Sequence, residues 1–120
     1  AKAVPVPRPK DRDLAFAAAQ DALLARGVTA VADMGVSLAD WHTYRRAGDA
    51  GRLAVRIMAY ADSFETLELA AGDEPTPWLY DERLRMGGIK IYLDGALGSR
   101  GASLKAPYAD ERGTRGLPLL

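Results

Sequence analysis

A lysine and an aspartate four residues apart have the most distinctive chemical setting in this sequence. Lys90 lies in the apolar, strand-like run GIKIYLDG, and Asp94 precedes the glycine-rich turn GALGSRG. Because side chains alternate along a strand, Lys90, Tyr92 and Asp94 are predicted to share one face, opposite the apolar side chains of the run. In a closed parallel barrel such a face is the interior, and the carboxyl end of the strand opens into the active site.

Each of these residues also has a purely structural interpretation. A lysine on a strand can lie at a sheet edge with its amine in water, and Asp-Gly is a common turn dipeptide. The run GALGSRG lacks the Gly-Lys-Ser/Thr ending of a phosphate-binding loop and also lacks a dinucleotide fingerprint. Tyr92 either lines a pocket or fills a layer of a barrel. Spacing alone therefore leaves both interpretations open.

Arg100, within the glycine-rich run, is a candidate for binding an anionic group of a substrate. Its planar guanidinium suits a carboxylate or phosphate, but it could equally pair with Asp110 or Glu111 and hold the loop. His42, the single histidine, lies in the helical segment DWHTYRR. Since structural zinc sites use about four ligands, we expect His42 to be a surface or interface residue. The absence of cysteine excludes disulfides and thiolate metal sites in this sequence.

Helix and strand signals alternate along the chain, which predicts an α/β fold with parallel strands. Asp13 and Ser37 are the predicted N-caps of the first two helices. The expected helices are 14–26, 38–51, 64–71 and 79–86, and the expected strands are 28–36, 53–60 and 89–95. We expect residues 1–12 to be an extended leading segment, 13–95 to belong to one α/β domain, and 96–120 to be a long loop of that domain.

Composition limits the function classes. The chain has 120 residues, 48% of them hydrophobic, with 16 basic and 16 acidic residues and no net charge. This balance argues against a nucleic-acid or anionic-membrane partner, and no apolar run approaches the roughly 20 residues of a membrane span. No signal-peptide pattern opens the sequence, and the compartment stays open. Three parallel strands alone would leave bare edges, so we expect a segment of a larger α/β protein.

The block GIKIYLDGALGSRGASLKAPYADERGTRGL resembles the hallmark block of amidohydrolase family 3, metal-dependent hydrolases of the amidohydrolase superfamily. Upstream, ARGVTAVADMGVS and AGRLAVRIMAY resemble the two preceding strand regions of that family, in the same order and with similar spacing. The resemblance covers nearly the whole chain from about Leu14 onward. It implies a partial (β/α)8 TIM barrel, with this chain supplying the second to fourth strands, their crossover helices and the long loop that follows.

The resemblance also implies a chemistry for Lys90. Lys90 matches the superfamily's fourth-strand lysine, which CO2 carboxylates in many members and whose carbamate bridges two divalent metal ions. The resemblance thus implies one or two divalent ions, with zinc as the expected metal. It also implies hydrolysis of an amide-like C–N bond of a small-molecule substrate by metal-activated water. Tyr92, Asp94 and Arg100 would contact that substrate. Burial and nearby cations favour the neutral amine that adds CO2, and the resulting anion suits divalent ions.

The other ligands of the family are not in this sequence. The family expects a His-x-His pair on the first strand, single histidines on the fifth and sixth, and an aspartate on the eighth as proton shuttle. His42 matches none of these, and Asp33 and Asp94 lie on other strands, so the remainder of the barrel is required. Two alternatives stay open: a barrel that has lost catalysis, and an open α/β binding domain that contacts an anionic small molecule. Substrate, metal identity and oligomeric state are not predicted.

Overall fold

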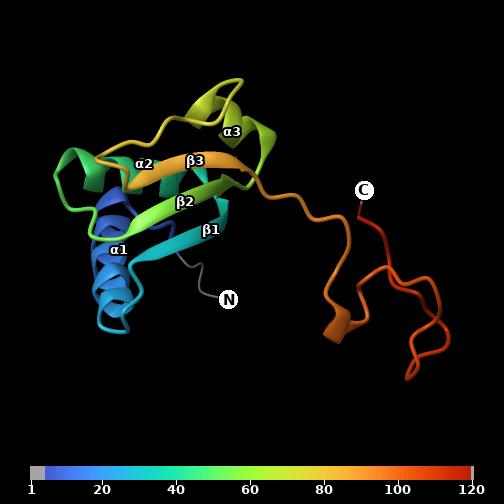
Figure 1. Cartoon of the computed structure of the whole chain (residues 1–120). Coiled ribbons are helices and arrows are strands. Elements are labelled where there is room, and N and C mark those ends of the chain that lie inside the picture. Colours follow the sequence, from blue (N-terminus) through green and yellow to red (C-terminus); the bar gives the residue numbers. More distant parts are fainter. Residues whose placement is uncertain (1–4, 120) are drawn as a thin grey trace. The chain divides into compact units, whose positions relative to one another are not determined.

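The structure is a computed structural model that describes residues 5–119. The chain divides into two compact units, with the boundary between Lys90 and Ile91. The first unit carries a parallel three-stranded sheet in the order β1-β2-β3 (Figure 1). The strands are β1 (Ala30–Val36), β2 (Arg56–Ala61) and β3 (Leu84–Ile89). The predicted α/β class with parallel strands is therefore confirmed.

Three helices alternate with the strands: α1 (Pro9–Leu24), α2 (Leu38–Asp49) and α3 (Phe64–Ala71). The predicted cap of α2 is confirmed, since the Ser37 hydroxyl accepts a hydrogen bond from the backbone N–H of Asp40 at 3.2 Å. The helix predicted over 64–71 has those bounds. Among residues 5–119, no helix combines the length and the apolar character that a membrane crossing requires.

The first helix begins earlier than predicted. It starts at Pro9, not Leu14, because proline suits the first helical position, and Arg8 and Asp11 form a capping box around it. Asp13, the predicted N-cap, lies inside the helix and pairs with Arg46 of α2 at 2.6 Å. The extended leading segment therefore ends at Arg8 in the described part of the chain.

The helix predicted over 79–86 is wrong. Tyr80, Asp81 and Glu82 have φ angles of 54°, 56° and 60°, and this left-handed backbone cannot continue a right-handed helix. The turn that they form leads directly into β3, which begins at Leu84 and ends at Ile89. The third strand thus lies about five residues before the predicted range 89–95.

The hydrophobic core lies between one face of the sheet and the helices. Alternate residues of β2 and β3 form it, each at most 2% exposed: Ile57, Ala59, Ala61, Leu84 and Met86. Trp41 and Ala47 of α2 belong to the same cluster, and side chains of α1 and α3 pack against it. In each strand, side chains that alternate with those facing the helices point to the opposite face of the sheet. Met34 of β1, which is 51% exposed, is one of them. We call this opposite face the open face.

A half-buried hydrogen bond joins β1 to α2 within the helix-covered layer. Asp33 pairs in register with the buried Ala59, so its carboxylate faces the helices. The Tyr44 hydroxyl donates to Asp33 Oδ2 at 2.5 Å, and the Tyr44 ring packs on Phe16. Burial, reinforced by the hydrogen bond to Asp33 and its charge, raises the pKa of Tyr44. The Asp33 carboxylate therefore holds Tyr44 between the sheet and the helices.

Replacing Tyr44 by phenylalanine is expected to lower the free energy of unfolding by about 1–3 kcal/mol, because the Asp33 carboxylate loses its donor. Urea unfolding of the full-length protein measures this, with the exposed His42→Ala as the control, for which we expect a change within about 0.5 kcal/mol.

The Tyr44 hydroxyl also makes stability depend on pH. Above about pH 10 the unfolded state loses the tyrosine proton first, so wild-type stability falls as pH rises. The phenylalanine variant lacks this hydroxyl and therefore this part of the pH dependence. Equal stability of the two proteins would contradict a structural role for the pair.

Candidate functional site

Lys90 lies at the carboxyl end of β3. Its backbone N–H donates to the carbonyl of Ala61 at 2.8 Å, so the ladder continues one residue past the strand. Ile89 pairs in register with Ala61, whose side chain faces the helices, and Lys90 follows Ile89. Gly87 is an extra residue in the pairing of β3 with β2, so the alternation of β3 changes phase after Met86. Lys90, which is half-buried and follows Ile89, therefore lies on the open face, the side predicted for it.

Tyr92 and Asp94 do not extend this strand face as predicted. Both belong to the second unit, and residues 90–93 have no regular strand structure. Ile91 and Leu93, expected to pack on the helices, are 43% and 67% exposed. The apolar-face prediction is wrong for these two residues, because the strand ends at Ile89.

Asp94 and Arg100 organise the second unit. Asp94 Oδ2 accepts a hydrogen bond from the backbone N–H of Ser103 at 2.9 Å. Arg100 Nη2 pairs with Asp110 Oδ2 at 2.9 Å, and its guanidinium lowers the pKa of that exposed carboxyl. Glu111 lies at the edge of the ion pair, 4.0 Å from Arg100 Nε. The loop-holding ion pair considered for Arg100 is therefore present, and its contact with a substrate stays a prediction.

Glycines permit the close backbone contacts of this second unit. The buried Tyr108 hydroxyl donates to the carbonyl of Ala102 at 2.9 Å. Gly116 crosses the same carbonyl so closely that a Cβ atom built on it would lie 2.0 Å from the oxygen, and its φ is +81°. A side chain at this position would therefore disrupt the loop both sterically and through its backbone conformation.

A Gly116→Ala change is accordingly expected to speed amide hydrogen exchange around Leu104 and Tyr108 by about fivefold or more, since strain of at least about 1 kcal/mol enters the loop. Gly113→Ala is the matched control, because no atom lies within 4 Å of its Cβ position. Mass spectrometry should show the same amide exchange rates in the Gly113→Ala control as in wild type. Identical exchange in all three proteins would show that the second unit is not ordered in this way.

The described residues do not form a metal centre by themselves. Within residues 5–119 there is no group of three or more His, Cys, Asp or Glu side chains that could hold an ion. His42 is exposed on α2, as expected for a surface residue. Lys90 would fit as a donor only as its carbamate, because an ordinary protonated lysine has no lone pair for a metal. Any further ligands would have to come from outside the described part of the chain.

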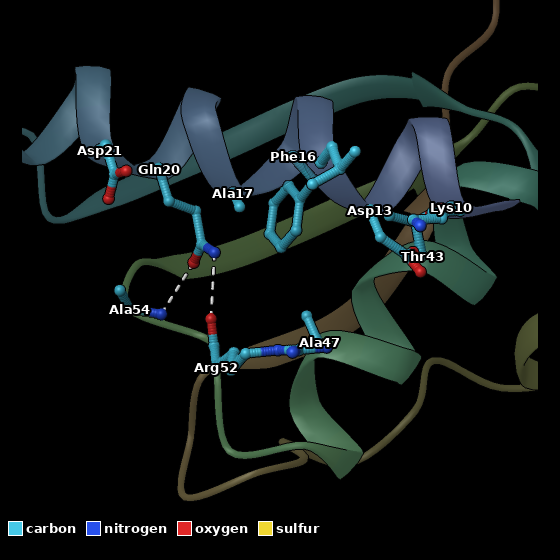
Figure 2. Close-up of a pocket in the computed structure, with 11 residues that line it drawn as sticks. Lys10, Asp13, Phe16, Ala17, Gln20, Asp21, Thr43, Ala47, Arg52 and Ala54 are labelled. Atoms are coloured by element: carbon cyan, nitrogen blue, oxygen red, sulfur yellow. Dashed lines mark hydrogen bonds between the residues drawn. The ribbon is translucent and has the colours of Figure 1, made fainter. Parts of the chain in front are cut away.

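A pocket of about 450 Å³ lies in the helical layer, between α1, α2 and the turn before β2 (Figure 2). Gln20, directed into it, already uses its amide: Nε2 donates to Arg52 O, and Oε1 accepts from the N–H groups of Ala54 and Val55. The pocket lies on the side of the sheet opposite to Lys90. We therefore assign it to the packing of α1.

Sequence reasoning missed two further residues of the open face, Tyr60 and Arg85. In the run RIMAYA, alternation alone opposes Met58 and Tyr60 to the buried Ile57, Ala59 and Ala61, so the signal for Tyr60 was present. Arg85 was assigned to a helix, which concealed its pairing with Met58. Both residues carry polar groups on the same face as Lys90.

Comparisons with known proteins agree with the observed fold. The sequence matches the amidohydrolase family over residues 2–120. Two crystal structures are similar, each described as an uncharacterized metal-dependent hydrolase. The one from Pyrococcus horikoshii OT3 is 28% identical with a TM-score of 0.83, covering 95% of this chain and 23% of that chain. The one from Pyrococcus furiosus is 30% identical with a TM-score of 0.82, covering 96% and 24%.

None of the curated proteins matches the chain. The chain spans less than a quarter of the length of each of these two solved structures. The family match, in contrast, extends over nearly the whole sequence, which confirms the resemblance carried by the GIKIYLDGALGSRGA block. The chain therefore belongs to the amidohydrolase family.

Proposed function

We propose that this chain is the part of a metal-dependent hydrolase that supplies a carboxylated-lysine ligand, Lys90. The full-length protein would hydrolyse an amide-like C–N bond of a small molecule. The observation that carries the proposal is the position of Lys90: half-buried, at the carboxyl end of a parallel strand, on the face that none of the helices in residues 5–119 covers. In parallel α/β barrels the active site lies at this end of the strands. Family membership and the two metal-dependent hydrolase structures support the same chemistry.

The open face supports closure of the sheet by further strands. Arg85 pairs in register with Met58 on this face, and its Nε is buried without a hydrogen-bond partner among the described residues. A buried guanidinium nitrogen without an acceptor is costly, so we expect an acceptor from outside these residues. A (β/α)8 barrel, closed by strands beyond this chain, would cover Arg85 and turn Lys90 inward.

The outer edge of β3 limits where the next strand of such a barrel can pair. Thr76 and Met86 share two hydrogen bonds: the Thr76 N–H donates to the Met86 carbonyl at 3.1 Å, and the Thr76 hydroxyl oxygen accepts from the Met86 N–H at 2.9 Å. Leu79 and Leu84 likewise exchange two backbone hydrogen bonds. A further strand would therefore pair with β3 beyond Met86, in the stretch that leads to Lys90.

Lys90 would acquire its ligand atoms in one balanced step. Its neutral Nζ attacks the carbon of CO2, so that an N–C bond forms while one C–O π bond breaks and its electron pair moves to the oxygen. A proton then leaves the nitrogen for solvent. The product is a carbamate anion with two oxygens, which would hold one or two divalent ions, with zinc as the first expectation. A divalent ion in such a site polarises the substrate carbonyl and lowers the pKa of a water molecule that it binds.

Metal analysis of the full-length protein tests this assignment. We expect the purified wild type to retain about one or two equivalents of divalent metal and Lys90→Ala to retain much less, since a ligand is lost. Lys105→Ala, at an exposed lysine of the second unit, is the matched control and should retain the wild-type content. Equal metal content in Lys90→Ala and wild type would refute the role of Lys90 as a ligand.

A further inference from the structure

Tyr60 is a polar side chain of the open face that the proposed function leaves without a role. It occupies the last position but one of β2 and pairs in register with Gly88 of β3. A Cβ atom built on Gly88 would lie 3.6 and 3.8 Å from Cδ1 and Cε1 of Tyr60. The Tyr60 ring therefore lies within van der Waals range of the position that a side chain at residue 88 would occupy.

The two consecutive glycines of β3 give room for this arrangement. At Gly87, a Cβ atom would lie 2.6 Å from the sulfur of Met58, the neighbour of Tyr60 on the same face. Met58 thus occupies the side-chain space at Gly87, and the Tyr60 ring borders the corresponding space at Gly88. A larger side chain at either position would compete with them for this space.

Tyr60 lies within diagonal reach of Lys90 on the open face. Lys90 follows Gly88 by two residues on the same face of the same strand, so the Cα atoms of Tyr60 and Lys90 lie diagonally opposite, about 8 Å apart. Aromatic and long side chains reach each other across this diagonal. Among residues 5–119 the Tyr60 hydroxyl makes no hydrogen bond, so its proton is available to a group held near Lys90.

We propose that Tyr60 is a positioning residue for Lys90: its hydroxyl donates a hydrogen bond to one oxygen of the Lys90 carbamate. This inference rests on the proposed function, because it requires Lys90 to be carboxylated. A phenol suits the role, since it donates one proton to an anion and its ring has room beside Gly88. Hydrogen bonds from a hydroxyl to an ionised oxygen are short and are about twice as strong as neutral ones.

The expected consequence is a more stable carbamate. A hydrogen bond to a charged group changes an equilibrium by about 10- to 100-fold, and only the carboxylated form of Lys90 offers an anionic oxygen. Tyr60→Phe should therefore raise the bicarbonate concentration that half-carboxylates Lys90 by that factor. The change removes one oxygen and keeps the ring, so the packing over Gly88 persists.

The carbamate carbon can be observed directly. Metal-free full-length protein is equilibrated with 13C-bicarbonate, and the carbamate signal is measured by 13C NMR as the bicarbonate concentration increases. Lys90→Ala identifies the signal by removing it. Met58→Leu, also on the open face of β2, is the matched control without a hydroxyl and should follow the wild-type curve. Thermal unfolding of each variant establishes that it is folded.

Two results separate this inference from the proposed function. If the wild type and Lys90→Ala give the same 13C spectrum, Lys90 carries no carbamate and the carboxylated lysine itself is refuted. If the signal is present but folded Tyr60→Phe follows the wild-type bicarbonate curve, the positioning role of Tyr60 is refuted and the proposed function stands. A 10- to 100-fold displacement in Tyr60→Phe alone supports the inference.

Discussion

Lys90→Ala is expected to lower kcat/KM of the full-length protein by about 10³-fold or more. Under the proposed function this change removes a ligand that holds and orients the metal, and metal-dependent stabilisation of the transition state contributes several kcal/mol. The loss should appear mainly in kcat, because the metal acts on the reacting bond more than on the remainder of the substrate. A panel of chromogenic N-acyl-p-nitroanilides provides the assay.

Partial recovery would distinguish a lost carboxylate from a lost fold. A short carboxylic acid such as acetate or propionate can enter the space left by the side chain and offer two oxygens to the metal. We therefore expect added acetate to raise the activity of Lys90→Ala, with no effect on Lys105→Ala. Wild-type activity in Lys90→Ala would show that the residue has no part in the chemistry.

The second large effect is structural and concerns Gln20. Its side chain is only 5% exposed, and one amide satisfies three backbone groups of residues 52–55, which lead into β2. Gln20→Met keeps a similar length but leaves these groups without partners. Because each buried unsatisfied group costs about 1–3 kcal/mol, and the adjoining pocket admits some water, we expect a loss of about 2–4 kcal/mol.

Urea unfolding of the full-length protein measures this loss. Asp21→Asn is the matched control, since Asp21 is the next residue of α1, lines the same pocket and is exposed. The control should remain within about 0.5 kcal/mol of wild type. A Gln20→Met protein as stable as the control would show that the strand entrance does not depend on this amide.

Local sequence signals predicted much of the fold. Ser37 determines the start of α2, which begins at the predicted residue. The β-branched run that precedes Ser37 determines β1, which ends at Val36 as predicted. These signals act within a few residues, so they are readable without the tertiary structure. The alternation of elements similarly predicted the parallel sheet.

The errors arose where backbone conformation or tertiary pairing decides. Nothing in the letters of the segment YDE shows that three successive residues adopt positive φ, and this turn is what converts the predicted helix into β3. The position of Lys90 on the open face was nevertheless predictable from alternation. The face of Tyr60 was likewise predictable from alternation. Its contact with Gly88 was not, because that contact depends on the β2–β3 register.

A crystal structure of the metal-loaded full-length protein, with anomalous scattering at the absorption edge of the metal, tests the central claim most directly. The account predicts additional density for a carboxyl group on Lys90 Nζ, with a metal ion about 2.0–2.2 Å from its oxygens, inside a closed ring of parallel strands. A bare Lys90 amine in solvent, with the metal bound elsewhere, would contradict it.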